Sequence, residues 1–368
     1  MLIVTTGISG TGRAHYCKRL ETYTALRDKK IKIKTPGNML FAEAKARGIR
    51  VTQENVLNLH RDTLHALLGI VFEKILSEIP QLLHEGYTII INLHGTFFWN
   101  DQYIPALNSN FLQKFNPDMY VNFIANSDVI VRTLKSNPQW CNLFSDDKAK
   151  TYALEKIMEW QSVEVLATKI AAQFDAKPFF IIPSGGTESI LYRLIFEPWR
   201  KKFYLGMPLT FLHGSEHAKS RERINLFAQW LEEYVILIDP RYVEPLGATQ
   251  LTSAHENKTV HHHVVGRDLN WLIPECDGMV GFYPEAVPSY GENCERLEVH
   301  RTNGKTFLIY PSTKLLSPFF TEWADEIFAS EEEFKPRFLA YLGNEYVRKV
   351  EDATMMGKGE ENGTSYMR

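Results

Sequence analysis

The stretch that most constrains the fold of this chain is its opening strand, glycine-rich turn and helix. Residues 2–6 (LIVTT) are apolar and β-branched, as in buried parallel strands, and residues 13–26 predict a helix. Between them, Gly7 and Gly12 have the G-x-x-x-x-G spacing of a phosphate-binding loop, or P-loop. Glycines let successive N–H groups turn towards phosphate oxygens, and the following helix points its positive end at them. The opening therefore predicts a parallel α/β domain that binds a nucleotide phosphate.

Two positions in this loop depart from the usual pattern. Arg13 stands where lysine is usual, and its planar guanidinium still neutralises phosphate. Ala14 stands where a serine or threonine would ligate magnesium, so it supplies no metal oxygen. We expect ATP to bind here and leave the need for Mg²⁺ open. The expected phosphate-binding residues are Gly7, Ser9, Gly10, Thr11, Gly12, Arg13 and Ala14.

Strand and helix patterns alternate along the whole chain. Strands are predicted at 31–35, 87–93, 119–125 and 178–182, then at 203–206, 235–239, 278–282 and 306–310. Long helices are predicted at 61–85, 146–173 and 220–234. Such alternation implies parallel sheets, and 368 residues exceed one ordinary core. We expect an α/β chain with doubly wound, Rossmann-like domains at 1–182 and 203–350, a linker at 183–202 and a disordered tail at 351–368.

Charge and cysteine usage limit the class of protein. A net charge of −3 and a pI near 6.5 give no long-range attraction for nucleic acid, so no nucleic-acid partner is expected. No apolar run approaches the ~20 residues of a membrane span. Four cysteines are scattered without a C-x-x-C pair: Cys17, Cys141, Cys276 and Cys294. Reduced thiols in the cytoplasm are therefore expected.

Short segments after the P-loop carry a resemblance to a known family. They are Gly37-Asn38-Met39-Leu40, Ile89 to Thr96 with Asn92-Leu93-His94 at its centre, Tyr103 to Leu107, and Asn116-Pro117-Asp118. In this order they resemble archaeal-type adenylate kinases over residues 1–182. The resemblance implies a nucleotide-acceptor site at Asn38, Asn92 and His94. The alternative for His94 is a hydrogen-bonded core histidine.

Two features of this half argue against efficient phosphoryl transfer. Asn92 replaces the aspartate that ends the corresponding strand in those kinases, and the arginine-rich lid is reduced to Arg132 and Lys135. Phosphoryl transfer needs concentrated positive charge and metal around the migrating group. The sequence therefore favours a nucleotide-binding domain with weak kinase activity or none.

The second half carries motifs at the predicted strand ends. Phe203 to Gly206 runs into Met207-Pro208-Leu209-Thr210, a tight exit that suits a ligand at a strand's carboxyl end. Acidic residues follow in Arg267-Asp268-Leu269, Asp277 to Tyr283 and Ser289 to Glu295, and Gly304-Lys305 comes last. Carboxylates placed around one sheet are suited to acid–base or nucleophilic chemistry.

These motifs resemble nucleoside 2-deoxyribosyltransferases and deoxynucleoside 5′-monophosphate N-glycosidases over residues 203–310. The resemblance implies that Glu295 is the nucleophile at C1′. Asp268 would bind the base or donate its proton, and Tyr204 would orient the catalytic carboxylate. Glu298, about one helical turn on, is the rival nucleophile. The implied substrate-binding residues are Gly206, Met207, Pro208, Thr210, Asp277, Ser289 and Gly291.

Ser289, two residues before Gly291, bears on the substrate. The transferases have an aspartate there, which accepts a hydrogen bond from a 5′-hydroxyl, whereas the monophosphate glycosidases have serine. A carboxylate would repel a 5′-phosphate and a hydroxyl can donate to it, so Ser289 favours nucleotides over nucleosides. The adjacent histidines 261–263 do not predict a metal site, because successive side chains of a strand alternate between faces.

The leading functional prediction is cleavage or exchange of the N-glycosidic bond of a (deoxy)nucleoside 5′-monophosphate, with an ATP-binding N-terminal domain. Small-molecule nucleotides are the expected partners, and a homo-oligomer is expected. One alternative is a nucleoside monophosphate kinase whose C-terminal domain only binds nucleotides. Another is a non-catalytic nucleotide sensor in stress or phage defence.

Overall fold

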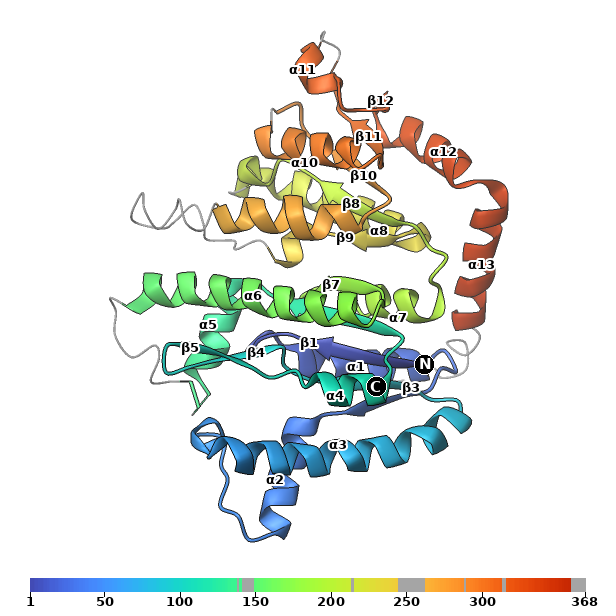
Figure 1. Cartoon of the computed structure of the whole chain (residues 1–368). Helices are drawn as coiled ribbons and strands as arrows, with labels where there is room; N and C mark the ends of the chain where they lie inside the picture. Colours follow the sequence, from blue (N-terminus) through green and yellow to red (C-terminus); the bar gives the residue numbers. More distant parts are fainter. Residues whose placement is uncertain are drawn as a thin grey trace, which may run out of the picture. The chain divides into compact units, whose positions relative to one another are not determined.

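The computed structural model describes residues 1–137, 139–140, 149–212, 215–243, 262–287, 289–312 and 316–358. The chain forms two compact units, one of Met1–Glu188 with Arg241–His263 and one of Ser189–Pro240 with Val264–Arg368. Each unit contains a five-stranded parallel sheet with helices packed against it (Figure 1). The α/β class with two Rossmann-like sheets is thus confirmed. None of the helices in the described ranges is both long and apolar enough to cross a membrane.

The N-terminal unit has the strand order β2-β3-β1-β6-β7. Its strands are β1 (Leu2–Thr6), β2 (Ile31–Lys34), β3 (Thr88–Asn92), β6 (Met119–Ile124) and β7 (Phe179–Pro183). Every residue of β1, β3 and β6 is buried. These central strands are apolar along their whole length because a parallel sheet is covered on both faces.

Six α-helices are described in this unit, and one of them, the long helix α6, contacts the phosphate loop through Glu164. They are α1 (Arg13–Ala25), α2 (Pro36–Ala46), α3 (Arg61–His84), α4 (Ser109–Phe115), α5 (Ser127–Lys135) and α6 (Ala149–Phe174).

A small hairpin absent from the predicted elements follows β3 in the N-terminal unit. Strands β4 (Thr96–Trp99) and β5 (Gln102–Pro105) pair antiparallel around Asn100 and Asp101. Both turn residues have positive φ, 50° and 56°, as a two-residue hairpin turn requires. The hairpin packs with α5 and α6 in an apolar cluster that also buries Ile8 of the P-loop.

The C-terminal unit has the strand order β12-β11-β10-β8-β9. Its strands are β8 (Lys202–Gly206), β9 (Ile236–Ile238), β10 (Gly278–Phe282), β11 (Lys305–Ile309) and β12 (Glu326–Phe328). Counted in chain order this is 2-1-3-4-5, which reverses direction between β8 and β10. In open parallel sheets a ligand crevice forms at the carboxyl ends of the strands on either side of such a reversal.

Helices and aromatic side chains enclose this second sheet. Phe227 of α8 stacks on Phe282 of β10 with ring centroids 4.3 Å apart, and Phe334 and Phe338 of α12 close the core. The elements are α7 (Ser189–Phe196), α8 (Ala218–Tyr234), α10 (Tyr290–Arg301), α11 (Pro318–Thr321), α12 (Glu331–Leu342), α13 (Asn344–Lys358) and a π-helical segment, Asp268–Leu272.

Two segments differ from the sequence-based expectation. The expected linker, 183–202, contains α7, because Ile190, Leu191 and other apolar residues of this helix are buried and Arg193 Nη1 donates to Val235 O at 3.0 Å. The tail, expected to lack structure from residue 351, is helical as far as Lys358. This helix is held at its centre by Val350, which is 2% exposed, and it packs against α12 and α8.

Candidate functional site

The P-loop lies between β1 and α1, and its glycines adopt backbone conformations that other residues avoid. Gly7, Gly10 and Gly12 have φ of 147°, 86° and 76°. A Cβ on Gly7 would lie 2.8 Å from Phe123 O, so this position requires glycine. No side chain of the described residues caps α1, which begins directly after Gly12. Its first turn therefore presents N–H groups suited to an anion.

Arg13 is directed back to the start of the loop. Its Nη1 donates to Gly7 O at 2.7 Å, and its Nη2 lies 3.4 Å from His94 Nε2. The side chain is almost fully buried, and burial lowers the pKa of Arg13 to about 10, against the opposing effect of Glu164. In this conformation the guanidinium stabilises the loop from within.

Glu164 of α6 is the residue in this region that the sequence interpretation missed. Its Oε1 accepts from Gly7 N at 2.8 Å and Gly95 N at 2.7 Å, and its Oε2 accepts from Thr96 N at 2.6 Å and Thr96 Oγ1 at 2.8 Å. The carboxylate, in a residue 1% exposed, thereby joins the loops after β1 and β3. A single glutamate in a long amphipathic helix carries no local signal of this role.

The residues expected at the acceptor site are only partly gathered. Asn92 is buried and its Oδ1 accepts from Thr5 Oγ1 at 3.2 Å. His94 is half-buried beside Arg13, and desolvation of the ring, followed by the Arg13 charge, holds the pKa of His94 well below its ordinary 6.5. Asn38 is exposed on α2 and makes none of the contacts of this cluster. A neutral, half-buried His94 fits the core interpretation as well as the site interpretation.

Tyr204 and Glu295 come together beside β8, next to the point where the strand order of the C-terminal sheet reverses. Tyr204 Oη, on β8, donates to Glu295 Oε1, on α10, at 3.0 Å. Burial raises the pKa of Tyr204 well above 10, and the charges of Asp268 and then Glu295 raise it further. Tyr204 is therefore a permanent hydrogen-bond donor to Glu295, and Asp268 lies close enough to act on the same hydroxyl.

Asp268 begins the π-helical segment and is bound by its neighbour. Arg267 Nε donates to Asp268 Oδ1 at 2.8 Å and Nη2 to Oδ2 at 3.1 Å. Asp268 is 5% exposed; its burial raises the pKa of the carboxyl, and Arg267 opposes that effect. Short π-helical segments are frequent at functional sites because they redirect one side chain of a helix.

A second glutamate of α10, Glu292, is fully buried next to Glu295. Tyr283 Oη donates to Glu292 Oε2 at 2.7 Å, and Arg296 Nη2 donates to the same oxygen at 3.0 Å and to Asn293 Oδ1 at 3.1 Å. The side chains of Glu292 and Arg296 have no exposed area. The i, i+4 spacing of a glutamate and an arginine was visible in the sequence, but its burial was not.

Two strand glycines make room for the two glutamates. Gly206 of β8 and Gly281 of β10 are partners in the parallel register. A Cβ on Gly206 would lie 3.1 Å from Glu292 Cγ and 3.4 Å from Glu295 Oε2, and a Cβ on Gly281 would lie 2.2 Å from Glu292 Oε1. We call this pair of glycines the glycine notch. It explains why side chains from α10 can lie against the sheet at this point.

The remaining candidate residues of this half are spread more widely. Ser289 caps α10, its Oγ accepting from Glu292 N at 3.3 Å, and Gly291 lies in the exposed first turn. Met207 is buried directly after β8, followed by Pro208. Thr210 belongs to the short helix Leu209–Phe211, but its side chain lies outside the described residues. Glu298 forms an ion pair with Arg301, with 3.6 Å between Glu298 Oε2 and Arg301 Nη1.

Asp277 is displaced from the other candidate residues. Its Oδ2 accepts from Lys202 N at 2.7 Å, at the first residue of β8, and it directly precedes β10. Asp277 therefore lies at the amino edge of the sheet, opposite to the carboxyl ends of the strands. The expectation that Asp277 contacts substrate at the carboxyl ends of the strands is wrong. The motif that begins with Asp277 marks the start of the buried strand β10.

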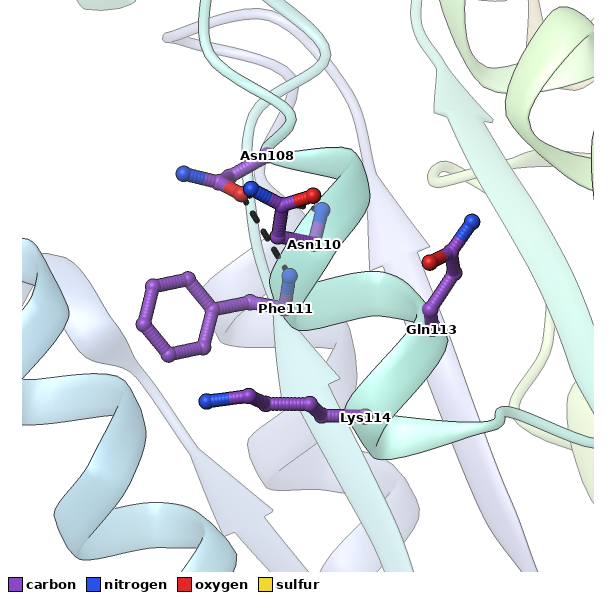
Figure 2. Close-up of a pocket in the computed structure, with 5 residues that line it drawn as sticks. All are labelled: Asn108, Asn110, Phe111, Gln113 and Lys114. Atoms are coloured by element: carbon purple, nitrogen blue, oxygen red, sulfur yellow. Dashed lines mark hydrogen bonds between the residues drawn. The ribbon is translucent and has the colours of Figure 1, made fainter.

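A hollow on the N-terminal unit is lined by none of these residues. Figure 2 shows it beside α4, lined by Asn108, Asn110, Phe111, Gln113 and Lys114. Asn108 Oδ1 accepts from Asn110 N and Phe111 N as the cap of α4, and Lys114 pairs with Glu73 at 2.6 Å. The polar groups of the hollow thus serve the local structure. Within the described part of the chain no group of three metal-ligating side chains is found, and His261 lies outside that part.

Comparison with known proteins bears on the first unit. A family model described as an AAA domain matches residues 6–148, which include the P-loop, β3 and the following hairpin. Together with the loop geometry, this match supports a P-loop, nucleotide-kinase-like N-terminal domain. No curated protein matches the chain.

Proposed function

We propose that the C-terminal unit cleaves or exchanges the N-glycosidic bond of a (deoxy)nucleoside 5′-monophosphate. The observation that carries the proposal is the Tyr204 to Glu295 hydrogen bond of 3.0 Å, next to the reversal of strand order between β8 and β10. A carboxylate held by a neutral tyrosine, with a second buried carboxyl nearby, is the pair of groups that glycosidic chemistry uses. The resemblance to deoxyribosyltransferases and N-glycosidases rests on the same residues.

In this proposal Glu295 attacks C1′ of the sugar while the C1′–N bond breaks. The electron pair of that bond leaves with the base, which needs a proton or a hydrogen bond, and Asp268 is positioned to supply one of these. The sugar is then held as an ester of Glu295. Water completes hydrolysis, or a second base completes exchange. Tyr204 orients Glu295 and stabilises the carboxylate once it is regenerated.

The 5′-phosphate is assigned to the N-terminus of α10. Ser289 Oγ accepts from Glu292 N, and its hydroxyl is also hydrogen-bonded to Tyr283, so a phosphate oxygen would replace Tyr283 as the acceptor of its O–H. The first-turn N–H groups and the helix dipole favour an anion at the same place. Glu295, in the second turn of the helix, would then face C1′ of the same nucleotide.

Chromatography of a mixed nucleotide pool tests this function. Incubation with the protein should release free bases from nucleoside 5′-monophosphates, and the Glu295→Gln variant should release none above background. Release by both proteins would assign the chemistry to another residue. A pool left intact by the wild-type chain would remove the glycosidase proposal.

For the N-terminal unit we propose ATP binding with weak phosphoryl transfer or none. The residues present do not fit the magnesium site of a P-loop kinase. Ala14 has no hydroxyl, the amide oxygen of Asn92 is bonded to Thr5, and Glu164 uses both oxygens on loop donors. Formation of ADP from ATP and a nucleoside monophosphate in the same pool would favour the kinase alternative. Nucleotide-dependent stabilisation without either product would favour the sensor.

A further inference from the structure

The Glu292–Arg296 pair is a buried ion pair that the proposed chemistry does not use. Both side chains are fully enclosed, yet Glu292 Oε1, Arg296 Nε and Arg296 Nη1 have no hydrogen-bond partner among the described residues. Unpaired polar atoms in a protein interior are destabilising. Well-packed apolar side chains in place of such a pair are often neutral or stabilising. Stability alone is therefore a weak reason for an ion pair here.

The place of the pair gives a better reason. Glu292, Glu295 and Arg296 are spaced i, i+3 and i+4, so all three point from α10 towards the sheet. Glu292 fits the glycine notch, with its Oε1 2.2 Å from where a Cβ of Gly281 would be. Arg296 and Tyr283 both donate to the other oxygen, which holds Glu292 in that rotamer.

Seating Glu292 in the notch fixes the rotation of α10 about its own axis. Glu292 and Glu295 lie less than one turn apart on the same helix. A rotation of α10 that moves Glu292 out of the notch therefore also moves Glu295 away from Tyr204. The Glu295 carboxylate also borders the notch, with its Oε2 3.4 Å from the Gly206 Cβ position. The position of Glu292 in the notch therefore determines the position of Glu295.

We propose that Glu292 and Arg296 are positioning residues for Glu295, seating α10 in the glycine notch so that Glu295 meets Tyr204. The proposal rests on the proposed glycosidic function of Glu295. The residues themselves are fully buried and contact no substrate. Their effect is to align the nucleophile with C1′.

The first test replaces the pair by apolar side chains, Glu292→Leu with Arg296→Met, in the full-length chain. The melting temperature should stay close to that of the wild type, because packing replaces the ion pair. The kcat for base release should fall by about tenfold or more with KM within about twofold, since alignment and not binding is lost. An unchanged kcat in this folded variant would overturn the positioning role.

A matched control uses another buried ion pair of the same unit, Glu197 with Arg200, whose side chains are 10% and 2% exposed. Glu197→Gln should lower the melting temperature and leave kcat unchanged at a temperature where the chain is folded. If Glu197→Gln lowered kcat as much as the apolar pair does, the effect at Glu292 would be general destabilisation.

A second pair of variants keeps the proposal testable if the apolar pair fails to fold. Gly281→Ala places a methyl group in the notch, so it should lower both the melting temperature and kcat. Adding Glu292→Ala removes the steric clash and should restore the melting temperature. The kcat should stay low, because no side chain at position 292 then fixes α10 in the notch. Recovery of both would show a purely structural role. Failure of the glycosidic function itself is distinguishable, because the wild-type chain would then release no base.

Discussion

At the scale of single residues, the two carboxyls of the proposed site have different surroundings. Glu295 is half-buried and accepts from a tyrosine, whereas Asp268 is 5% exposed and bound by Arg267 through two hydrogen bonds. Different surroundings push two carboxyl groups towards different roles at one pH. The roles assigned to them can be separated by substitutions that keep side-chain shape.

Glu295→Gln should abolish base release while substrate binding is largely kept. Glutamine retains the shape and accepts from Tyr204 but cannot form the sugar ester, so kcat should fall by at least about 10³-fold. Single-turnover base release measured by chromatography checks this, with Glu298→Gln as the control on the same helix. A large loss in Glu298→Gln together with an active Glu295→Gln would show that the nucleophile was misassigned.

Ser289→Asp should reverse the preference between nucleotides and nucleosides. Aspartate caps a helix as well as serine does, so α10 should stay intact. Its charge beside a 5′-phosphate should weaken monophosphate binding by about a hundredfold, and nucleosides should be affected less. Competition assays with a monophosphate and its nucleoside give the ratio. Equal losses for both would place the phosphate elsewhere.

His94 should make the stability of the N-terminal unit depend on pH. Its pKa is well below 6.5 in the folded chain because the half-buried ring is desolvated and lies beside Arg13, whereas the unfolded chain titrates near 6.5. The unfolded state therefore binds the extra proton first, and stability should fall as the pH drops below about 6.5, by up to about 1.4 kcal/mol per pH unit. Urea unfolding at pH 5, 6 and 7 measures the slope. His94→Gln, which cannot titrate, should flatten it, and an unchanged slope would assign the effect to another group.

At the scale of elements, the P-loop is built as much from distant segments as from its own glycines. Glu164 of α6 bonds its first residue, and Ser184, after β7, donates to Thr11 O. Gly10 abuts Ile130 and Leu134 of α5, whose atoms would lie 3.2 Å from an added Cβ. The conformation of the loop is therefore held from three sides by the unit's own helices and strands.

Glu164→Gln should loosen this loop and weaken ATP binding. A carboxamide offers one acceptor oxygen and turns an NH₂ group towards backbone donors, so one pair of hydrogen bonds becomes a repulsive contact. The loss should be about 2–4 kcal/mol of stability for the N-terminal unit. Thermal melting and ATP titration by calorimetry measure both effects. Tighter ATP binding in the variant would show that Glu164 competes with the nucleotide.

At the scale of the whole molecule, the two compact units have separate apolar cores and separate candidate sites. Ligands should therefore stabilise them separately. A ligand at about a hundred times its Kd adds about 2.7 kcal/mol to the unit that binds it. In hydrogen exchange of the full chain, ATP should protect β1 and α1, and a nucleoside monophosphate should protect β8 and α10. Protection of one unit by both ligands would assign both binding sites to that unit.

Much of the architecture was determined by the sequence alone, because the relevant signals are local. Five consecutive β-branched or apolar residues predict β1, the glycine spacing predicts the P-loop, and the boundaries of β10 are those expected from composition. The hydrogen bond of Tyr204 to Glu295 brings together two residues that the resemblance to deoxyribosyltransferases implies as partners.

Only the tertiary structure decided which polar residues become buried and with what partners. Glu164 and Glu292 look like ordinary helix-surface glutamates in the sequence, yet both are 1% exposed and bonded to groups far away in the chain or beneath the helix. Asp277 looks like a site residue, yet it lies at the opposite edge of the sheet. The physical reason is that hydrophobic periodicity specifies which face of an element is buried, whereas the partner of a buried charge depends on the loops and strands that reach it.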